Sequence, residues 1–225
     1  MEINKIGYLK TQFKTKFGVP RQSGIVKSSH ATLVFEEKYR NPESLRGLEG
    51  YSHVWVIWGF SECKETEFSP TVRPPRLGGN TRVGVFASRS PFRPNNLALS
   101  VLKLEGIEKT EKYGHVLNLS GADMMDSSPV YDIKPYLPQF DSIPDASGGF
   151  STEIDSYLLN VTIPEELKAG LSDSFISGLY EVLSQDPRPS YIDTPDRIFG
   201  FLYDGYEVKF TVNEKDLTVV EITCC

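Results

Sequence analysis

Two arginines in a short segment bounded by prolines are well suited to hold an anion. Arg89 and Arg93 lie in "SRSPFRPNN", between two apolar runs. Pro91 and Pro94 fix the backbone φ angle and remove backbone donors, so the sequence predicts a stiff loop here. Each guanidinium can offer a planar pair of donors to a carboxylate or a phosphate. The alternative is that both arginines pair with acids elsewhere in the fold.

Two further segments combine basic residues with proline. "TVRPPRLGGN" places Arg76 close to two glycines, but the chain contains neither GxxxxGK[ST] nor a GxGxxG after a strand, so the usual helix-start phosphate sites are excluded. "SQDPRPSY" supplies Arg188, which can meet a phosphate, and Tyr191, which can stack on a base. A helix end with a packed tyrosine fits the second segment equally well.

An acidic segment supplies candidate proton acceptors. Asp123, Asp126 and Asp132 lie within ten residues of one another and are followed by Lys134 and Tyr136. A carboxylate near arginines stays ionised and can accept a proton. For Asp126 a turn is an equally good interpretation, because Asp-Ser-Ser-Pro is typical turn sequence. Asp126 and Asp132 are therefore both candidate bases, with Lys134 and Tyr136 as groups that orient the substrate.

The charge is distributed unevenly along the chain. The net charge is −6, yet residues 3–35 carry six basic side chains and no acid, and residues 68–104 carry six more and again no acid. Because charges act locally, within about 8–10 Å in physiological salt, a basic face on an acidic body suits a phosphate or polyanion ligand. Two solvated surface segments that happen to be basic are the alternative.

Composition narrows the class of protein. The chain has 225 residues, 39% of them hydrophobic and 24% charged, which is typical of a globular protein with one large or two small domains. No apolar run approaches the roughly 18 residues of a membrane helix, and no signal peptide is apparent. An odd number of cysteines and widely spaced histidines indicate a reducing cytoplasm and no metal site; these residues are Cys63, Cys224, Cys225, His30, His53 and His115.

The first two-thirds of the chain predicts a mainly β fold. Five short runs rich in Val, Leu and aromatic residues predict strands at 31–35, 52–60, 81–89, 97–107 and 115–125. No long helical pattern separates them, so a closed barrel or sandwich is favoured over a doubly wound sheet. The run at 52–60 is apolar at nearly every position, which predicts burial on both faces. A short helix is expected within 41–51, capped by Asn41 or Ser44.

The last third predicts a separate α+β unit. Residues 142–152 have the composition of a linker, which divides the chain into domains at 1–145 and 146–225. A helix is expected after Pro164, because apolar side chains recur every four residues at Leu167, Leu171, Phe175, Leu179 and Leu183. Asp204-Gly205 predicts a type I′ hairpin, and residues 217–222 can add a third strand.

Five segments in order along the chain resemble the bacterial TsaA-like (TrmO) family: "KFGVPRQSGIVKS", "TVRPPRLGGN", "GVFASRSPFRPNNLALS", "VYDIKPYLPQFDSIPDA" and "LSQDPRPSY". Members of that family methylate tRNA at N6 of threonylcarbamoyladenosine, the modified base beside the anticodon. The resemblance implies an S-adenosylmethionine donor, a single-sheet β-barrel and a homodimer, with a C-terminal domain that assists tRNA binding. One departure is that Asn96 and Ala98 stand where the family usually has proline and glycine.

The resemblance implies cofactor contacts at Pro20, Arg21, Gln22, Ser61, Glu62, Arg89, Leu99, Ser120, Gly121, Ala122 and Asp123. For the tRNA side we assign Arg76, Arg93, Asn95, Arg188 and Tyr191. The expected function is methyl transfer from S-adenosylmethionine to N6 of threonylcarbamoyladenosine at position 37 of tRNA. Two alternatives stay open, a non-catalytic RNA- or anion-binding module and an S-adenosylmethionine-dependent methyltransferase of another small substrate.

Overall fold

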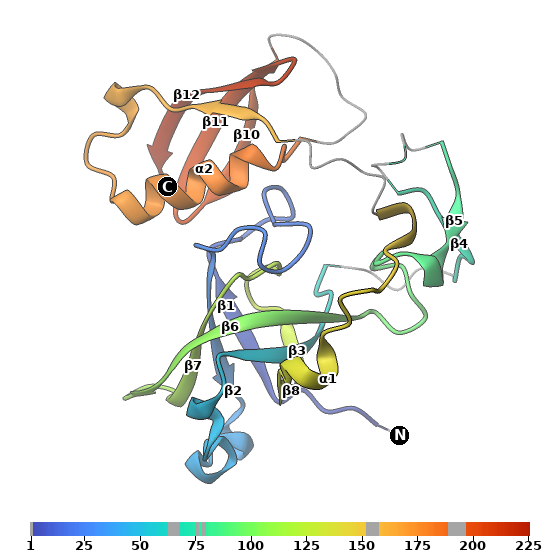
Figure 1. The fold of residues 1–225 in the computed structure, drawn as a ribbon. Coiled ribbons are helices and arrows are strands. Elements are labelled where there is room, and N and C mark those ends of the chain that lie inside the picture. The colour runs from blue at the N-terminus through green and yellow to red at the C-terminus, as the bar shows by residue number, and fades with distance from the viewer. Residues whose placement is uncertain (1, 63–67, 75–76, 78–79, 152–157, 189–196) are drawn as a thin grey trace.

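A computed structural model describes the whole chain except residues 1, 63–67, 75–76, 78–79, 152–157 and 189–196. It contains a β-barrel and a smaller α+β unit that packs against one end of the barrel (Figure 1). The predicted fold class, mainly β with a barrel followed by a small α+β unit, is therefore confirmed. None of the helices in the described ranges is long and apolar enough to cross a membrane.

Within the described part of the chain, six antiparallel strands close the barrel in the order β1-β2-β7-β6-β3-β8. Side chains alternate across the sheet, so every second residue points into the barrel. On β3 these are Val54, Val56 and Trp58, all buried, and Leu33 and Leu102 join them from β2 and β6. The strands are β1 (Gly7–Thr11), β2 (His30–Phe35), β3 (His53–Gly59), β6 (Leu97–Thr110), β7 (Gly114–Ser120) and β8 (Pro129–Pro135).

Two local expectations for the barrel were wrong, and a third was confirmed in part. The run at 52–60 is buried on one face only, because its other face looks outward and is half-buried. Residues 81–89 form only the two-residue strand β5 (Val83–Gly84), which pairs with β4 (Thr71–Val72), before the short 3-10 turn η5 (Val85–Ala87). Within 41–51 the short helix is present as the 3-10 helix η2 (Pro42–Leu45), which Asn41 caps as expected, and a second one, η3 (Leu48–Gly50), follows it. Another 3-10 helix, η1 (Glu37–Tyr39), precedes this segment.

The C-terminal unit is a four-stranded sheet, order β10-β11-β12-β9, covered by one helix. The hairpin at Asp204-Gly205 is confirmed, and both residues have positive φ, +47° and +82°, as a type I′ turn requires. The helix starts later than expected, at the Ser172 cap. Between the barrel and this unit come α1 (Pro138–Asp141), which packs against the barrel, and η6 (Gly149–Ser151). The elements of the C-terminal unit are β9 (Asn160–Thr162), η7 (Glu165–Leu167), α2 (Asp173–Ser184), β10 (Phe199–Tyr203), β11 (Tyr206–Asn213) and β12 (Asp216–Cys224).

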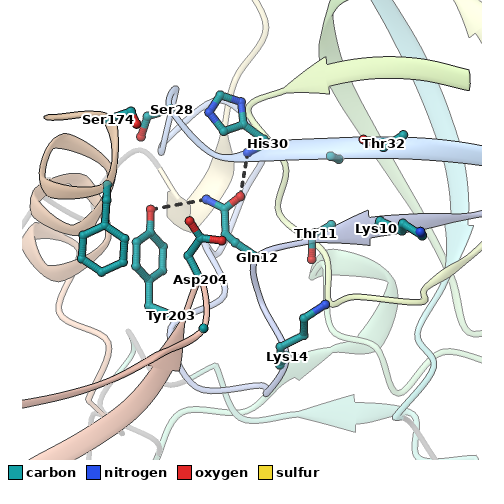
Figure 2. Close-up of a pocket in the computed structure, with 13 residues that line it drawn as sticks. Lys10, Thr11, Gln12, Lys14, Ser28, His30, Thr32, Ser174, Tyr203 and Asp204 are labelled. Carbon is teal, nitrogen blue, oxygen red and sulfur yellow. Dashed lines mark hydrogen bonds between the residues drawn. The ribbon is translucent and has the colours of Figure 1, made fainter. Parts of the chain in front are cut away.

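The loop between β1 and β2, residues 12–29, joins the two units (Figure 1). Phe13 and Val26 belong to this loop, yet they are buried in the hydrophobic core of the C-terminal unit. Polar contacts accompany them. Gln12 accepts a hydrogen bond from the backbone of His30 at 2.8 Å and donates one to the Tyr203 hydroxyl at 3.4 Å (Figure 2). The barrel and the C-terminal unit are therefore packed through this loop.

Gly18 and Gly47 offer a matched test of this packing. Both have positive φ, +88° and +86°, but an added Cβ would lie 2.5 Å from the Phe201 ring at Gly18 and would meet nothing within 4 Å at Gly47. Gly47→Ala should therefore cost only the backbone strain, about 1–2 kcal/mol. Gly18→Ala should cost a further 1–3 kcal/mol or so of overpacking, measured by urea unfolding. Equal losses of unfolding free energy for the two variants would contradict tight packing of the β1–β2 loop against Phe201.

Candidate functional site

Backbone hydrogen bonds hold two distant segments together at one end of the barrel. Gly24 donates its backbone N–H to the Gly121 carbonyl at 2.9 Å, and Gly121 donates to the Ser29 carbonyl at 2.9 Å. Gly121 has a φ of +79°, and a Cβ there would lie 3.3 Å from the backbone of Gly24. The buried Ser29 hydroxyl donates to the Ala122 carbonyl at 2.9 Å. This close crossing brings the predicted cofactor segments 20–22 and 120–123 side by side.

The carboxylate of Asp123 lies at this crossing within a chain of hydrogen bonds. The Ser100 hydroxyl donates to it at 2.7 Å, and the Trp58 indole N–H donates to the Ser100 hydroxyl at 3.0 Å. The backbone N–H of Ser23 also donates to this carboxylate. Burial raises the pKa of Asp123 above its ordinary value, while the Ser100 hydrogen bond and the positive charge of Arg89 oppose that rise. The site therefore pairs a shielded carboxylate with a nearby guanidinium.

Arg89 reaches the site from the proline-bounded loop. Its guanidinium donates a hydrogen bond to the side-chain oxygen of Gln22, and the residue is exposed. Four of the predicted cofactor residues are thus linked at one place: Gln22, Arg89, Gly121 and Asp123.

The other predicted cofactor residues lie at different depths and make different contacts. Pro20 is buried, and the exposed Arg21 donates to the Asp186 carbonyl at 3.3 Å. Ser61 and Glu62 are exposed just after β3, where Lys16 donates to the Glu62 carbonyl at 3.1 Å. The Ser120 hydroxyl donates to Glu105 at 2.5 Å, and this bond lowers the pKa of Glu105.

Arg93 has a different environment from Arg89. Its guanidinium donates to the carbonyls of Val85 at 3.1 Å and Ser88 at 2.7 Å and lies 5.7 Å from the centre of the Phe86 ring. These contacts fix the path of the loop that presents Arg89. Asn95, predicted to contact tRNA, is exposed on the same loop. Ala98 sits in β6 opposite Trp58, in regular strand conformation, so the loss of the family's glycine introduces no strain there.

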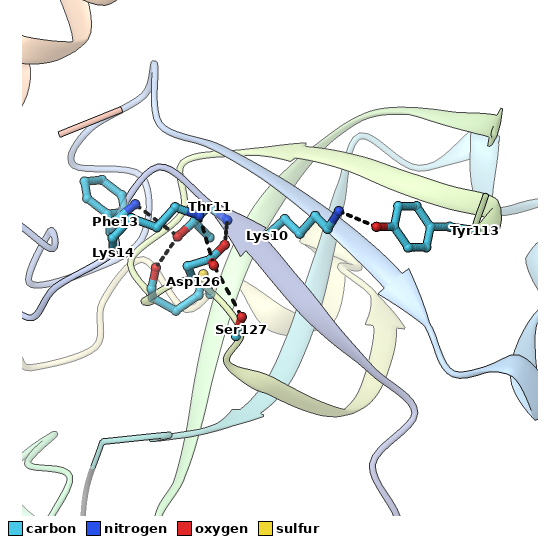
Figure 3. Close-up of polar contacts among 8 residues, drawn as sticks. Lys10, Thr11, Phe13, Lys14, Tyr113, Asp126 and Ser127 are labelled. Carbon is cyan, nitrogen blue, oxygen red and sulfur yellow. Dashed lines mark hydrogen bonds and ion pairs between the residues drawn. The ribbon is translucent and has the colours of Figure 1, made fainter. Parts of the chain in front are cut away.

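Asp126, one of the two candidate bases, closes a turn (Figure 3). Its carboxylate accepts the backbone N–H of Thr11 at 2.9 Å and pairs with the ammonium of Lys14 at 2.9 Å. Its own backbone N–H donates to the Phe13 carbonyl at 2.8 Å. These contacts attach the β7–β8 turn to the end of β1, which is the turn interpretation of this residue.

Asp132, Lys134 and Tyr136 lie on the outer face of β8. Asp132 is exposed and stands opposite Ile57 of β3, and Ile57 stands opposite Leu99 of β6 on its other side. Lys134 stands opposite Trp55, whose ring centre is 5.7 Å from that of Tyr136. Leu99, a predicted cofactor residue with 53% of its surface exposed, therefore shares an outer face with the second candidate base.

Arg188 is held by Asp186. Its guanidinium donates to both carboxylate oxygens, at 2.8 and 2.9 Å, and only 9% of its side chain is exposed. Its charge is thus paired at the base of the segment that follows α2. Arg76 and Tyr191 lie outside the described residues. No group of three or more potential metal ligands occurs among the residues that the structure describes.

Ser100 and Trp58 were missed by the sequence reasoning. A signal existed, because Ser100 is the single polar residue in "LALSVL" and falls at an inward-facing position of its strand. A buried hydroxyl needs a hydrogen-bond partner, and here it has two. What the sequence did not supply is the register that sets Ser100 beside both Trp58 and Asp123.

Comparisons with known proteins cover both units. Residues 8–142 match the tRNA-methyltransferase O N-terminal domain, and residues 151–224 match the TrmO C-terminal domain. A tRNA (adenine(37)-N6)-methyltransferase of Escherichia coli (strain K12) is 40% identical over 196 residues, which are 84% of this chain and 83% of that protein.

Two further relatives come from Pseudomonas aeruginosa. A putative S-adenosylmethionine-dependent methyltransferase RcsF is 37% identical over 96% of this chain and 94% of its own length. A crystal structure of TrmO superimposes with a TM-score of 0.78 at 30% identity, covering 99% of this chain and 98% of that one. Because matches of this quality extend over the barrel and the C-terminal unit alike, the chain belongs to the TrmO family.

Proposed function

We propose that this chain methylates N6 of threonylcarbamoyladenosine at position 37 of tRNA and binds S-adenosylmethionine at the barrel end around Arg89 and Asp123. Its relatives over most of the chain are tRNA (adenine37-N6)-methyltransferases and S-adenosylmethionine-dependent enzymes, and the chain is an enzyme of that class. The assignment of this site depends on one observation, which is that the structure brings together Gln22, Arg89, Gly121 and Asp123.

The residues at this convergence fit the cofactor. S-adenosylmethionine carries a carboxylate, an ammonium group and an adenosine, and when bound it supplies a methyl group on a sulfonium. The exposed guanidinium of Arg89 offers donors to a carboxylate, and Asp123 offers an acceptor to an ammonium group. The Gly24–Gly121 crossing is too close for a side chain at Gly121, and its backbone hydrogen bonds hold the segment that carries Asp123.

Positioning is expected to provide much of the catalysis. Arg93 acts as a positioning residue, because its bonds to the Val85 and Ser88 carbonyls fix the loop that carries Arg89. Methylation would form a bond from N6 to the methyl carbon as the methyl–sulfonium bond breaks and S-adenosylhomocysteine leaves. N6 would also lose its proton, which the carbamoyl group on threonylcarbamoyladenosine makes more acidic. Asp132 is our candidate acceptor, since it is exposed whereas Asp126 is engaged by Lys14.

We assign the cofactor to residues 1–145 and a tRNA-assisting role to residues 146–225. Asn95, Lys134 and Tyr136 are exposed or half-exposed on the barrel side, and we keep them as tRNA contacts or orienting groups. Arg188 supports the C-terminal segment through Asp186 and Phe199. We also infer a cytoplasmic location, where tRNA is modified and the thiols stay reduced.

A homodimer is proposed for α1 and the outer face of β3 and β6. Leu99 and Phe140 are large apolar residues with 53% and 76% of their surfaces exposed. Phe140 belongs to α1, which rests on this face because the Trp55 indole N–H donates to Asp141 at 3.0 Å. The sequence resemblance implies a homodimer, and an exposed apolar face is the kind of surface that a second copy buries.

Arg89→Ala tests the cofactor site. Removing a charged hydrogen-bond donor should weaken S-adenosylmethionine binding about 10- to 100-fold in calorimetry. Arg82→Ala, in the β4–β5 region where Arg82 contacts Thr71, should bind like the unmodified enzyme. Equal affinity for the Arg89 variant would remove Arg89 from the site. Mass analysis of nucleosides from tRNA incubated with the enzyme and S-adenosylmethionine tests the reaction. A protein that binds tRNA but has no affinity for S-adenosylmethionine would instead be a non-catalytic RNA-binding module.

Ser100→Ala tests the hydrogen-bond chain to Asp123. The Ser100 hydroxyl stabilises the charged carboxylate, so its loss should raise the pKa of Asp123 further. Carboxyl carbon NMR across a pH titration measures this directly. Ser100→Thr should retain the titration of the unmodified protein, and the exposed Ser44→Ala is the control. An unchanged Asp123 titration in Ser100→Ala would show that the chain does not tune this carboxylate.

Phe140→Asp tests the dimer. A charge in a buried apolar contact should shift the sedimentation coefficient toward that of a monomer at micromolar concentration. Val220→Asp, on the exposed side of β12, should leave the sedimentation coefficient unchanged. A monomeric unmodified protein, or equal behaviour of both variants, would refute this interface.

A further inference from the structure

A cleft separate from the Arg89 site lies between the barrel and the C-terminal unit (Figure 2). Its volume is about 270 Å³. One wall comes from β1, β2 and the β1–β2 loop, and the other from the first turn of α2 and the β10–β11 turn. The volume is near the lower end for small-ligand sites, roughly 300 Å³, which suits one nucleotide-sized group.

Cations line the barrel side of this cleft. Lys10 and Lys14 belong to the acid-free run at 3–35 that the Arg89 site does not account for. The Lys10 ammonium donates to the Tyr113 hydroxyl at 2.9 Å (Figure 3), a bond that raises the pKa of Lys10. Lys112 lies 5.1 Å from the same Tyr113 ring. Two ammonium groups, those of Lys10 and Lys14, therefore border the cleft.

Two acids, Asp126 and Asp204, offset the charge of Lys10 and Lys14, so the cleft offers ammonium donors rather than a net positive charge. Lys14 pairs with Asp126 through one contact, and 54% of its side chain remains exposed. An ammonium group has three donors, so this pairing leaves capacity for a phosphate oxygen. Asp204 lines the opposite wall. Glu181 accepts from both the backbone and the hydroxyl of Ser28 at 3.0 Å, which directs it toward the domain contact.

The cleft and the Arg89 site share one loop. Ser28 and His30 line the cleft, while Gly24 and Ser29 of the same segment hold Gly121 at the cofactor site. The substrate RNA is much longer than its methylated nucleotide, so phosphates on either side of that nucleotide must cross the enzyme surface nearby. Lysines are common partners for such phosphates, which fix register without reading sequence.

We propose that this cleft binds a phosphodiester group of the substrate RNA outside the methylated nucleotide, with Lys10 and Lys14 as the phosphate contacts. The inference rests on tRNA being the substrate. It adds a second, sequence-independent contact that uses both domains and that lies apart from the pocket assigned to S-adenosylmethionine. The domain packing described above would then hold the two sides of an RNA-binding cleft at a fixed spacing.

The test measures tRNA affinity against salt. Lys10→Ala and Lys14→Gln should each weaken tRNA binding and reduce the slope of log K against log [salt] by about 1. Lys10→Arg should retain the slope. Lys5→Ala is the control, because Lys5 pairs with Glu36 at 2.7 Å and does not line the cleft. The same affinity and slope for Lys10→Ala and Lys5→Ala would overturn the proposal.

Ser174→Glu tests the cleft by a change in its opposite wall, on α2. Ser174 is exposed in the first turn of α2, where an acidic side chain favours the helix, so the variant should fold normally. Its negative charge should nevertheless raise the KM for tRNA several-fold, with kcat at saturating tRNA and the S-adenosylmethionine Kd unchanged. An unchanged KM would count against the cleft. Failure of the unmodified enzyme to methylate tRNA would refute the proposed function instead, since lysine-dependent tRNA binding is measured separately.

Discussion

The packing of the β1–β2 loop between two hydrophobic cores is the constraint on which the rest of the structure depends. Phe13 and Val26 leave the barrel and are buried in the C-terminal core, while Gly24 and Ser29 of the same loop hold the Gly121 turn. Apolar burial therefore fixes the domain arrangement, and backbone hydrogen bonds fix the site. Because the β1–β2 loop makes both the apolar contacts and the backbone hydrogen bonds, a change in domain packing would alter the positions of Asp123 and Arg89.

The basic residues divide into distinct physical roles. Arg93 donates hydrogen bonds to carbonyls of its own loop, and Arg188 is paired with Asp186. Arg89 is exposed beside Gln22 and near the half-buried Asp123, which is why we propose it for the anionic group of the cofactor. These three arginines come from similar proline-rich segments, yet they differ in role because the local fold supplies each with different partners.

Local sequence signals predicted much of the fold. Alternating apolar runs predicted most barrel strands, and Asp204-Gly205 predicted the hairpin, because both signals are local. The two-residue strand β5 and the late start of α2 were not predicted, since Ser172 capping competed with a plausible Pro164 start. For Asp126 the sequence left two interpretations equal, and the contacts with Lys14 and Thr11 support the turn.

The sequence alone determined the mainly β class, the C-terminal α+β unit, the position of the arginines among prolines and the resemblance to the family to which the chain belongs. These follow from periodicity, turn residues and ordered motifs, which are properties of neighbouring residues. Only the tertiary structure decided that Ser100 and Trp58 support Asp123, and that Lys10 and Lys14 border a cleft between domains. Those relations depend on strand register and on long-range packing of the β1–β2 loop, which no local pattern encodes.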